Sequence, residues 1–210
     1  MFRLSLWQAD LPRLPIMLAG LSGFAAIGAV VLWSAYFIQV DLNRSVLAYG
    51  LMCLPMALTG TISCLVAKRL ITSKRVDIAF LFGGISVLAM AGFAFLAEDR
   101  ASDMYAAIAL ACAGLCYGFI NASLSAAMMD TFPAAQSGDA SAIASLSKQF
   151  GQLIGVAMVA QWKNLSGSSA ASDMSWLFLL MGACGGVMLV CAVLRAAERR
   201  GGGIPYPASK

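Results

Sequence analysis

The feature that most constrains this chain is a series of long apolar runs without a single charged residue. A helix that crosses a membrane needs about 20 mostly apolar residues, and each of these runs is about that long or longer. Five runs contain no Asp, Glu, Lys or Arg, and a sixth is interrupted only by Lys148; they cover 14–40, 45–67, 78–97, 104–129, 174–194 and, as the interrupted one, 140–162. The sequence therefore predicts six membrane spans.

Composition supports lipid as the solvent of this chain. Of its 210 residues, 60% are hydrophobic and 11% are charged, whereas soluble domains carry roughly 25% charged residues. In lipid the backbone must satisfy its own hydrogen bonds, so long apolar runs become helices. None of the runs shows the sustained alternation of a barrel strand.

The expected fold is an all-α membrane protein with six transmembrane helices, in one domain. We expect a cytoplasmic N-terminal segment at 1–13, a transmembrane domain at 14–196 and a disordered cytoplasmic tail at 197–210, which is rich in Gly and Pro. The expected helices lie near 14–40, 45–68, 77–97, 103–131, 139–162 and 174–196.

Basic residues predict the orientation. Short cytoplasmic loops are enriched in Lys and Arg. The N-terminus, the second and fourth loops and the C-terminal tail together hold ten basic residues, whereas the opposite side holds Arg44, Arg100 and Lys163. We therefore expect a multi-pass protein of the plasma membrane (the inner membrane in a bacterium) with both termini in the cytoplasm. The first apolar run is too long for the core of a usual signal peptide, so we expect it to be retained.

Several classes of site are disfavoured by the residues present. The chain has no histidine and no Cys-x-x-Cys pair, which argues against a zinc or haem site. Phosphate-binding loops and nucleophile elbows are also missing from the sequence. We therefore expect no enzymatic activity, no cofactor and no metal. The net charge of +4 reflects the cytoplasmic loops and does not indicate a nucleic-acid partner.

The fifth run carries an unusual polar row. Ser141, Ser145, Lys148 and Gln152 are spaced by four, three and four residues, which places them on one face of a helix. If the helix begins near Ser137, Lys148 lies about 16 Å along its axis. A lysine so deep costs at least about 2.5 kcal/mol. A snorkelling, purely structural lysine is one explanation; a lysine that faces a water-filled cavity or a buried partner is the favoured one.

Other residues of the spans form smaller groups. Ser147, Gly151 and Gly155 make a second row of small residues on the fifth run, which predicts close packing against another helix. Asn121 lies on the fourth run together with Ser123 and Ser125. Trp33, Tyr36 and Gln39 lie towards the outer end of the first run, where the two aromatic residues are also typical of a membrane interface.

Three segments resemble transporters of the major facilitator superfamily, in their drug:proton antiporter branch. "SVLAYGLMCLPMAL" (45–58) resembles the family's Ser-Pro-Leu-Gln-Ala-Gly segment, and "YFIQ" (36–39) resembles the Tyr-Leu-Gln end of the helix before it. The segment at 118–158 resembles a run that ends in Arg-Gln-x-Gly-x-x-x-Gly-Val-Ala, with Lys148 where the Arg usually stands. From residue 36 to residue 158, these segments together span most of the chain.

The resemblance implies the C-terminal half of a transporter built from two six-helix halves. Such a protein, when complete, would expel small amphipathic or anionic compounds by proton antiport. The expected pathway residues are Lys148, Gln149, Gln152, Asn121, Ser145, Ser141, Tyr36 and Gln39. The expected partners are the lipid bilayer, a small-molecule substrate, and either a first-half six-helix segment or a second copy of the chain.

The chain also departs from the family pattern. The loop "CLVAKRLITSKR" has Lys68 where the family often has Asp, and no carboxylate lies well inside a run. The proton-coupling acid that the family supplies from its first half is therefore not found here. The alternative is a membrane interaction protein or a truncated remnant that does not transport.

Overall fold

The computed structural model describes residues 14–73, 75–132, 136–166 and 175–200, which are helical except for short connections. Six of its segments are long and apolar enough to cross a membrane, so the expected fold class is confirmed for the described residues. The elements are α1 (Leu14–Tyr36), the π-helix η2 (Phe37–Asp41), α2 (Val46–Met52), α3 (Leu54–Thr72), α4 (Val76–Asp99), α5 (Asp103–Thr131), α6 (Ser137–Ser166) and α7 (Ser175–Arg200).

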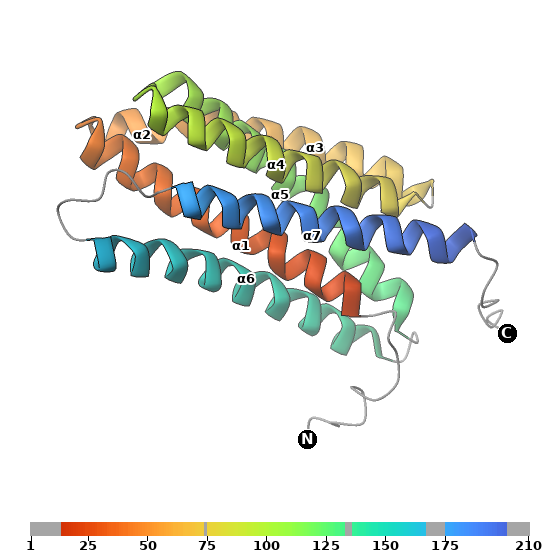
Figure 1. The fold of residues 1–210 in the computed structure, drawn as a ribbon. Helices are drawn as coiled ribbons and strands as arrows, with labels where there is room; N and C mark the ends of the chain where they lie inside the picture. The colour runs from red at the N-terminus through yellow and green to blue at the C-terminus, as the bar shows by residue number, and fades with distance from the viewer. Residues whose placement is uncertain (1–13, 74, 133–135, 167–174, 201–210) are drawn as a thin grey trace, which may run out of the picture.

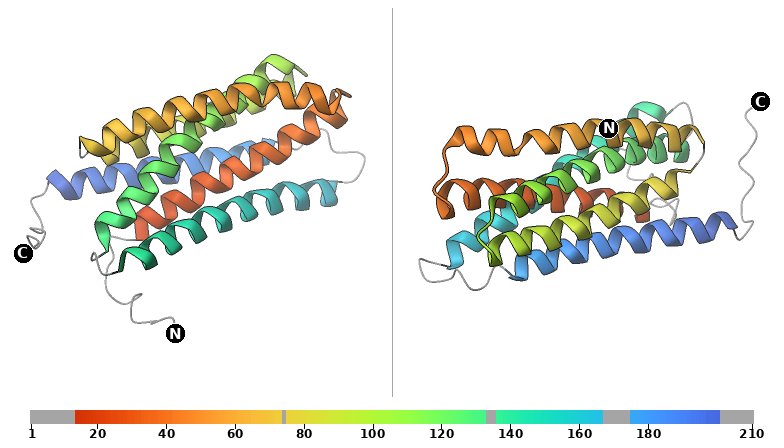
Figure 2. Two further views of the ribbon diagram at one scale, coloured as in Figure 1. Left: turned by 180° about the vertical axis from the view of Figure 1, so that it is seen from behind. Right: turned by 90° about the horizontal axis from the view of Figure 1, so that it is seen from above.

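The helices form a bundle in which α6 lies along one edge and the α2–α3 span along the opposite edge (Figure 1). Between these edges, α1 packs against α5, α6 and α7, and α4 packs against α5 and α7. Consecutive spans run in opposite directions, so the first turn of α1 and the last turn of α7 lie at the same end of the bundle (Figure 2). This arrangement makes α1, together with η2, the central span.

The first span is the most buried one, with 72% of its most apolar window inside the bundle. Trp33 is completely buried. Its ring stacks on Phe37 at 5.1 Å and meets the edge of Phe178 at 5.5 Å. Trp33 is therefore a packing residue between α1 and α7.

The second span runs over Val46–Thr72, close to the 45–68 that the sequence predicts, and it is divided into α2 and α3 at a single residue, Cys53. Ser45 caps α2 by accepting a hydrogen bond from the backbone N–H of Ala48 at 3.2 Å. Cys53 keeps a right-handed helical conformation, with a φ of −80° and a ψ of −14°, and α3 begins with Pro55 in its first turn. Because proline has no N–H and its ring clashes with the preceding turn, a helix cannot pass through it undisturbed.

A row of small residues holds α3 against α5. A Cβ atom added to Gly114 or Gly118 would collide with the backbone of α3. Thr59 donates a hydrogen bond from its hydroxyl to the carbonyl of Ala111 at 2.7 Å. The hydroxyl of Ser63 lies between the carbonyl of Gly60 in its own helix, at 3.0 Å, and that of Gly114 in α5, at 3.3 Å. Close backbones and polar links of this kind are how membrane helices associate without a hydrophobic driving force between them.

Several helices extend beyond the expected bounds. The last helix continues to Arg200, so the tail expected to be disordered from residue 197 is helical over its first four residues. The sequence there is rich in Ala, Glu and Arg, which have high helix propensity in water. At the end of the bundle where α5 begins, Arg44 forms an exposed ion pair with Asp103 at 2.8 Å.

Candidate transport pathway

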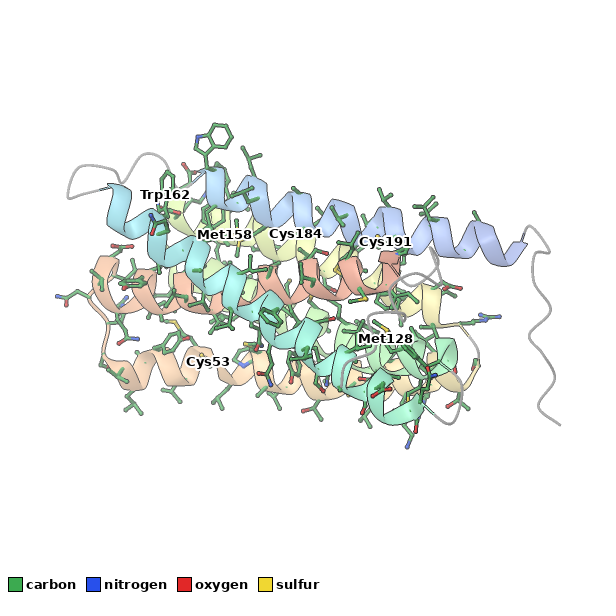
Figure 3. The ribbon with its side chains drawn as sticks, turned by 90° about the horizontal axis from the view of Figure 1, so that it is seen from below. Cys53, Met128, Met158, Trp162, Cys184 and Cys191 are labelled. Atoms are coloured by element: carbon green, nitrogen blue, oxygen red, sulfur yellow. The ribbon has the colours of Figure 1, made fainter. Side chains whose placement is uncertain are left out.

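The position of α6 is fixed by its contact with α1. A Cβ atom added to Gly151 would lie 2.6 Å from the carbonyl oxygen of Leu21, and one added to Gly155 would collide with the backbone at Ala25. From the other side, a Cβ atom on Gly28 would lie 2.5 Å from the carbonyl oxygen of Gln152. The two backbones thus approach as closely as glycine permits. Figure 3 shows α6 crossing in front of α1, with Trp162 towards one end of α6.

Ser147 takes part in the same contact surface of α6. It is buried, and its hydroxyl donates to the carbonyl of Ile143 at 2.9 Å, one turn earlier in α6. Its polar group is therefore satisfied inside its own helix, and only a small side chain faces the neighbour.

Lys148 extends from α6 towards α5. Its Nζ atom donates a hydrogen bond to the hydroxyl of Ser125 at 2.9 Å. Ser125 in turn donates to the backbone carbonyl of Asn121 at 3.0 Å. The lysine is half-buried, and it forms no ion pair with any carboxylate in the described part of the chain.

The remaining polar residues of α6 lie on the exposed flank of the helix. Ser145, Gln149 and Gln152 are exposed, as is Ser141, whose hydroxyl donates to the carbonyl of Gly138 at 2.9 Å. The exposed apolar residues of α6 lie further round the helix; they include Leu146, Phe150 and Leu153. The helix therefore has three sides: a packed one, a polar one and an apolar one.

Tyr36 and Gln39 do not join this group. The part of α1 that faces Gly151 is near Leu21 and Phe24. Tyr36 lies more than ten residues further along, or roughly 18 Å at 1.5 Å per residue. Tyr36 is exposed and Gln39 is half-buried in η2, so these two residues occupy the other end of the same span.

Two residues of α5, the helix that Lys148 contacts, were not singled out as pathway residues from the sequence. Ser125 accepts the hydrogen bond from Lys148. Tyr117 is 40% exposed, and its ring meets the edge of Phe24 at 5.9 Å. The signal that could have identified them is their spacing, because Tyr117, Asn121 and Ser125 follow one another at intervals of four along α5. Ser123, by contrast, is buried in the bundle.

The fold and the polar flank together define a polytopic α-helical membrane protein with polar side chains placed deep within its spans. The chain belongs to the Major Facilitator Superfamily, whose family model matches residues 2–156. It is therefore a membrane transporter of the major facilitator type, a family of transporters rather than enzymes. No curated protein matches the sequence.

Proposed function

We propose that this chain is the C-terminal six-helix half of an efflux transporter, which expels small amphipathic or anionic compounds by proton antiport when it is paired with a first half. In this proposal the pathway is lined by the polar flank of α6 and by Asn121 of α5. The protein lies in the plasma membrane, with both termini in the cytoplasm.

The observation that carries the proposal is the exposure of polar side chains at the middle of a membrane helix. Gln149 and Gln152 are exposed within one turn of Lys148, in the middle of α6. A polar or ionised group that faces hydrocarbon is costly, so such groups face a bundle interior or water. A pathway between two halves would supply that water.

Proton coupling would require a group from the other half. In the described segments, the carboxylates lie in the first or last turns of the helices, as Asp77 does in α4 and Asp103 does in α5. A protonatable carboxylate midway across the membrane would have to come from the first half. The same observation favours the alternative function, a membrane interaction protein or remnant without transport of its own.

Proton movement in inverted membrane vesicles separates the two functions. One preparation contains the chain alone, and the other contains the chain together with a six-helix first half. The proposal predicts that an amphipathic substrate collapses a respiration-driven pH gradient only in the second preparation. No substrate-dependent collapse in either preparation would favour the interaction protein.

Variants of Lys148 sharpen this experiment. Lys148→Met should abolish the substrate-dependent collapse while leaving the amount of folded protein unchanged, and Lys148→Arg should retain part of the activity. Lys68→Met, at the exposed end of α3, is the matched control and should behave like the parent. Full activity of Lys148→Met would contradict the proposed pathway.

A further inference from the structure

The ammonium group of Lys148 has more hydrogen-bond donors than the described part of the chain has acceptors for it. A lysine carries three N–H donors and a full charge, and the described chain offers it one hydroxyl, that of Ser125. A hydroxyl is a dipole and does not neutralise the charge. A group that brings both a negative charge and further acceptor oxygens would complete this site.

Ser125 is arranged to hold the ammonium in place. Its hydroxyl hydrogen is engaged with the carbonyl of Asn121 at 3.0 Å, so the oxygen presents a lone pair to Lys148 at 2.9 Å. An oxygen that already donates is a better acceptor for the next bond in the chain. Ser125 is therefore a positioning residue for the lysine.

An exposed aromatic ring lies on the same face of α5. Tyr117 lies two turns from Ser125, about 12 Å along the helix axis, with Asn121 between them. The ring is braced by Phe24 of α1 and remains 40% exposed. The surface from Lys148 to Tyr117 is thus cationic at one end, polar in the middle and aromatic at the other end.

We propose that this surface is a binding site for an organic monoanion with a flat apolar body. A carboxylate or sulfonate group pairs with Lys148, the amide of Asn121 lies alongside the molecule, and its rings lie against Tyr117. This inference rests on the proposed function, because it names the class of substrate that the pathway accepts.

Equilibrium binding to the full chain in lipid nanodiscs tests the inference without requiring transport. The probes are 2-naphthoate, the neutral 2-naphthylmethanol and the cationic 2-naphthylmethylammonium. The parent should bind the anion at least tenfold more tightly than either of the others. Lys148→Met should lose that preference, Lys148→Arg should stay within about threefold of the parent, and Lys68→Met should not differ from it.

Two further variants separate the parts of the site. Ser125→Ala should weaken binding of 2-naphthoate and leave the affinity for 2-naphthylmethanol unchanged. Ser125→Thr, which keeps the hydroxyl, should bind 2-naphthoate as the parent does. Tyr117→Leu should weaken binding of both 2-naphthoate and 2-naphthylmethanol. If Lys148→Met does not fold, Lys148→Gln takes its place. Equal affinity for the three probes, or unchanged binding of 2-naphthoate to the variant without the lysine, would overturn the inference.

An anionic lipid head group has the same chemistry as the proposed ligand, so the nanodiscs are made both from phosphatidylcholine alone and with phosphatidylglycerol. We expect the same affinity for 2-naphthoate in both. Loss of 2-naphthoate binding by the parent in the discs that contain phosphatidylglycerol, with binding retained in phosphatidylcholine alone, would assign the site to lipid and overturn the inference.

The result also remains distinct from that of the transport experiment. Binding of 2-naphthoate that depends on Lys148, without transport in the vesicles, would uphold the site and refute the transporter. Transport at the same rate for anionic, neutral and cationic substrates would uphold the transporter and refute the anion site.

Discussion

Replacing Gly155 by alanine should force α1 and α6 apart. A Cβ atom at this position would lie 2.8 Å from both the carbonyl carbon of Ala25 and the backbone nitrogen of Ala29. These are backbone atoms of a helix, which cannot turn away as a side chain can. The same Cβ atom would collide with the carbonyl oxygen of Ala25, so relief of the contact requires the two helices to separate locally by about 1 Å or more. A gap of roughly 0.5–1 Å already forfeits a quarter to a half of the dispersion energy between facing atoms.

Two opposing terms set the size of the effect. Overpacking of this kind costs about 1–3 kcal/mol, while alanine is better than glycine within a helix by about 0.8–1.0 kcal/mol. Because the colliding atoms belong to a helix backbone, the cost lies in the upper part of that range, at about 2–3 kcal/mol. After the helix-propensity gain is subtracted, we expect Gly155→Ala to lower the free energy of unfolding by about 1–2 kcal/mol. Gly155→Leu should lower it by more, because a larger side chain needs a wider separation.

Gly92 of α4 is the matched control. Among the described atoms, nothing beyond its own helix lies within 4 Å of a Cβ atom added there, so only the helix-propensity term remains. Gly92→Ala should raise the free energy of unfolding by up to about 1 kcal/mol. Circular dichroism during reversible unfolding in detergent measures the free energy of unfolding of both variants. The reasoning is refuted if Gly155→Ala is as stable as the parent, or if the two substitutions shift stability in the same direction.

Three further predictions concern stability and orientation. Ala101, the second residue after α4, has a φ of 44°, a conformation that favours glycine. Ala101→Gly should therefore raise the free energy of unfolding by about 0.5–1 kcal/mol in the same assay; a loss would contradict this. Thr59→Val removes the hydrogen bond to α5 and should lower the free energy of unfolding by about 0.6 kcal/mol, and at most by about 1.7 kcal/mol. Thr61→Val removes a hydrogen bond within α3 and should lower it by less. Equal losses for the two variants would show that the bond between the helices adds no stability. Reporter fusions at Lys210 and Lys163 should report opposite sides of the membrane, and the same side for both would refute the proposed orientation.

The number, type and approximate bounds of the spans could be predicted from the sequence, because the absence of charge over about 20 residues leaves few other structures in lipid. Pro55 signals the interruption of the second span at Cys53, but the sequence does not fix its extent. The reason is that a membrane helix can tolerate proline where neighbours satisfy the freed backbone groups, so the residue alone does not decide between a bend and a break.

The candidate site was predictable only in part. The spacing of Ser141, Ser145 and Lys148 places them on one face of a helix, but it does not say which neighbouring helix that face meets. The contact with Ser125 depends on how closely α1 holds α6 through Gly151 and Gly155. For the same reason Tyr36 could not be separated from the Lys148 group by its sequence alone.

Cysteine accessibility at two adjacent positions of α6 tests the central claim most directly. Gln152 lies on the polar flank, while Leu153 lies at almost the same depth on the apolar side and is 64% exposed. In a background without the six native cysteines, Gln152→Cys in intact membranes should react with a membrane-impermeant thiol reagent, and Leu153→Cys should stay unlabelled. Labelling of Leu153→Cys in preference to Gln152→Cys would place the polar flank in lipid and contradict the account.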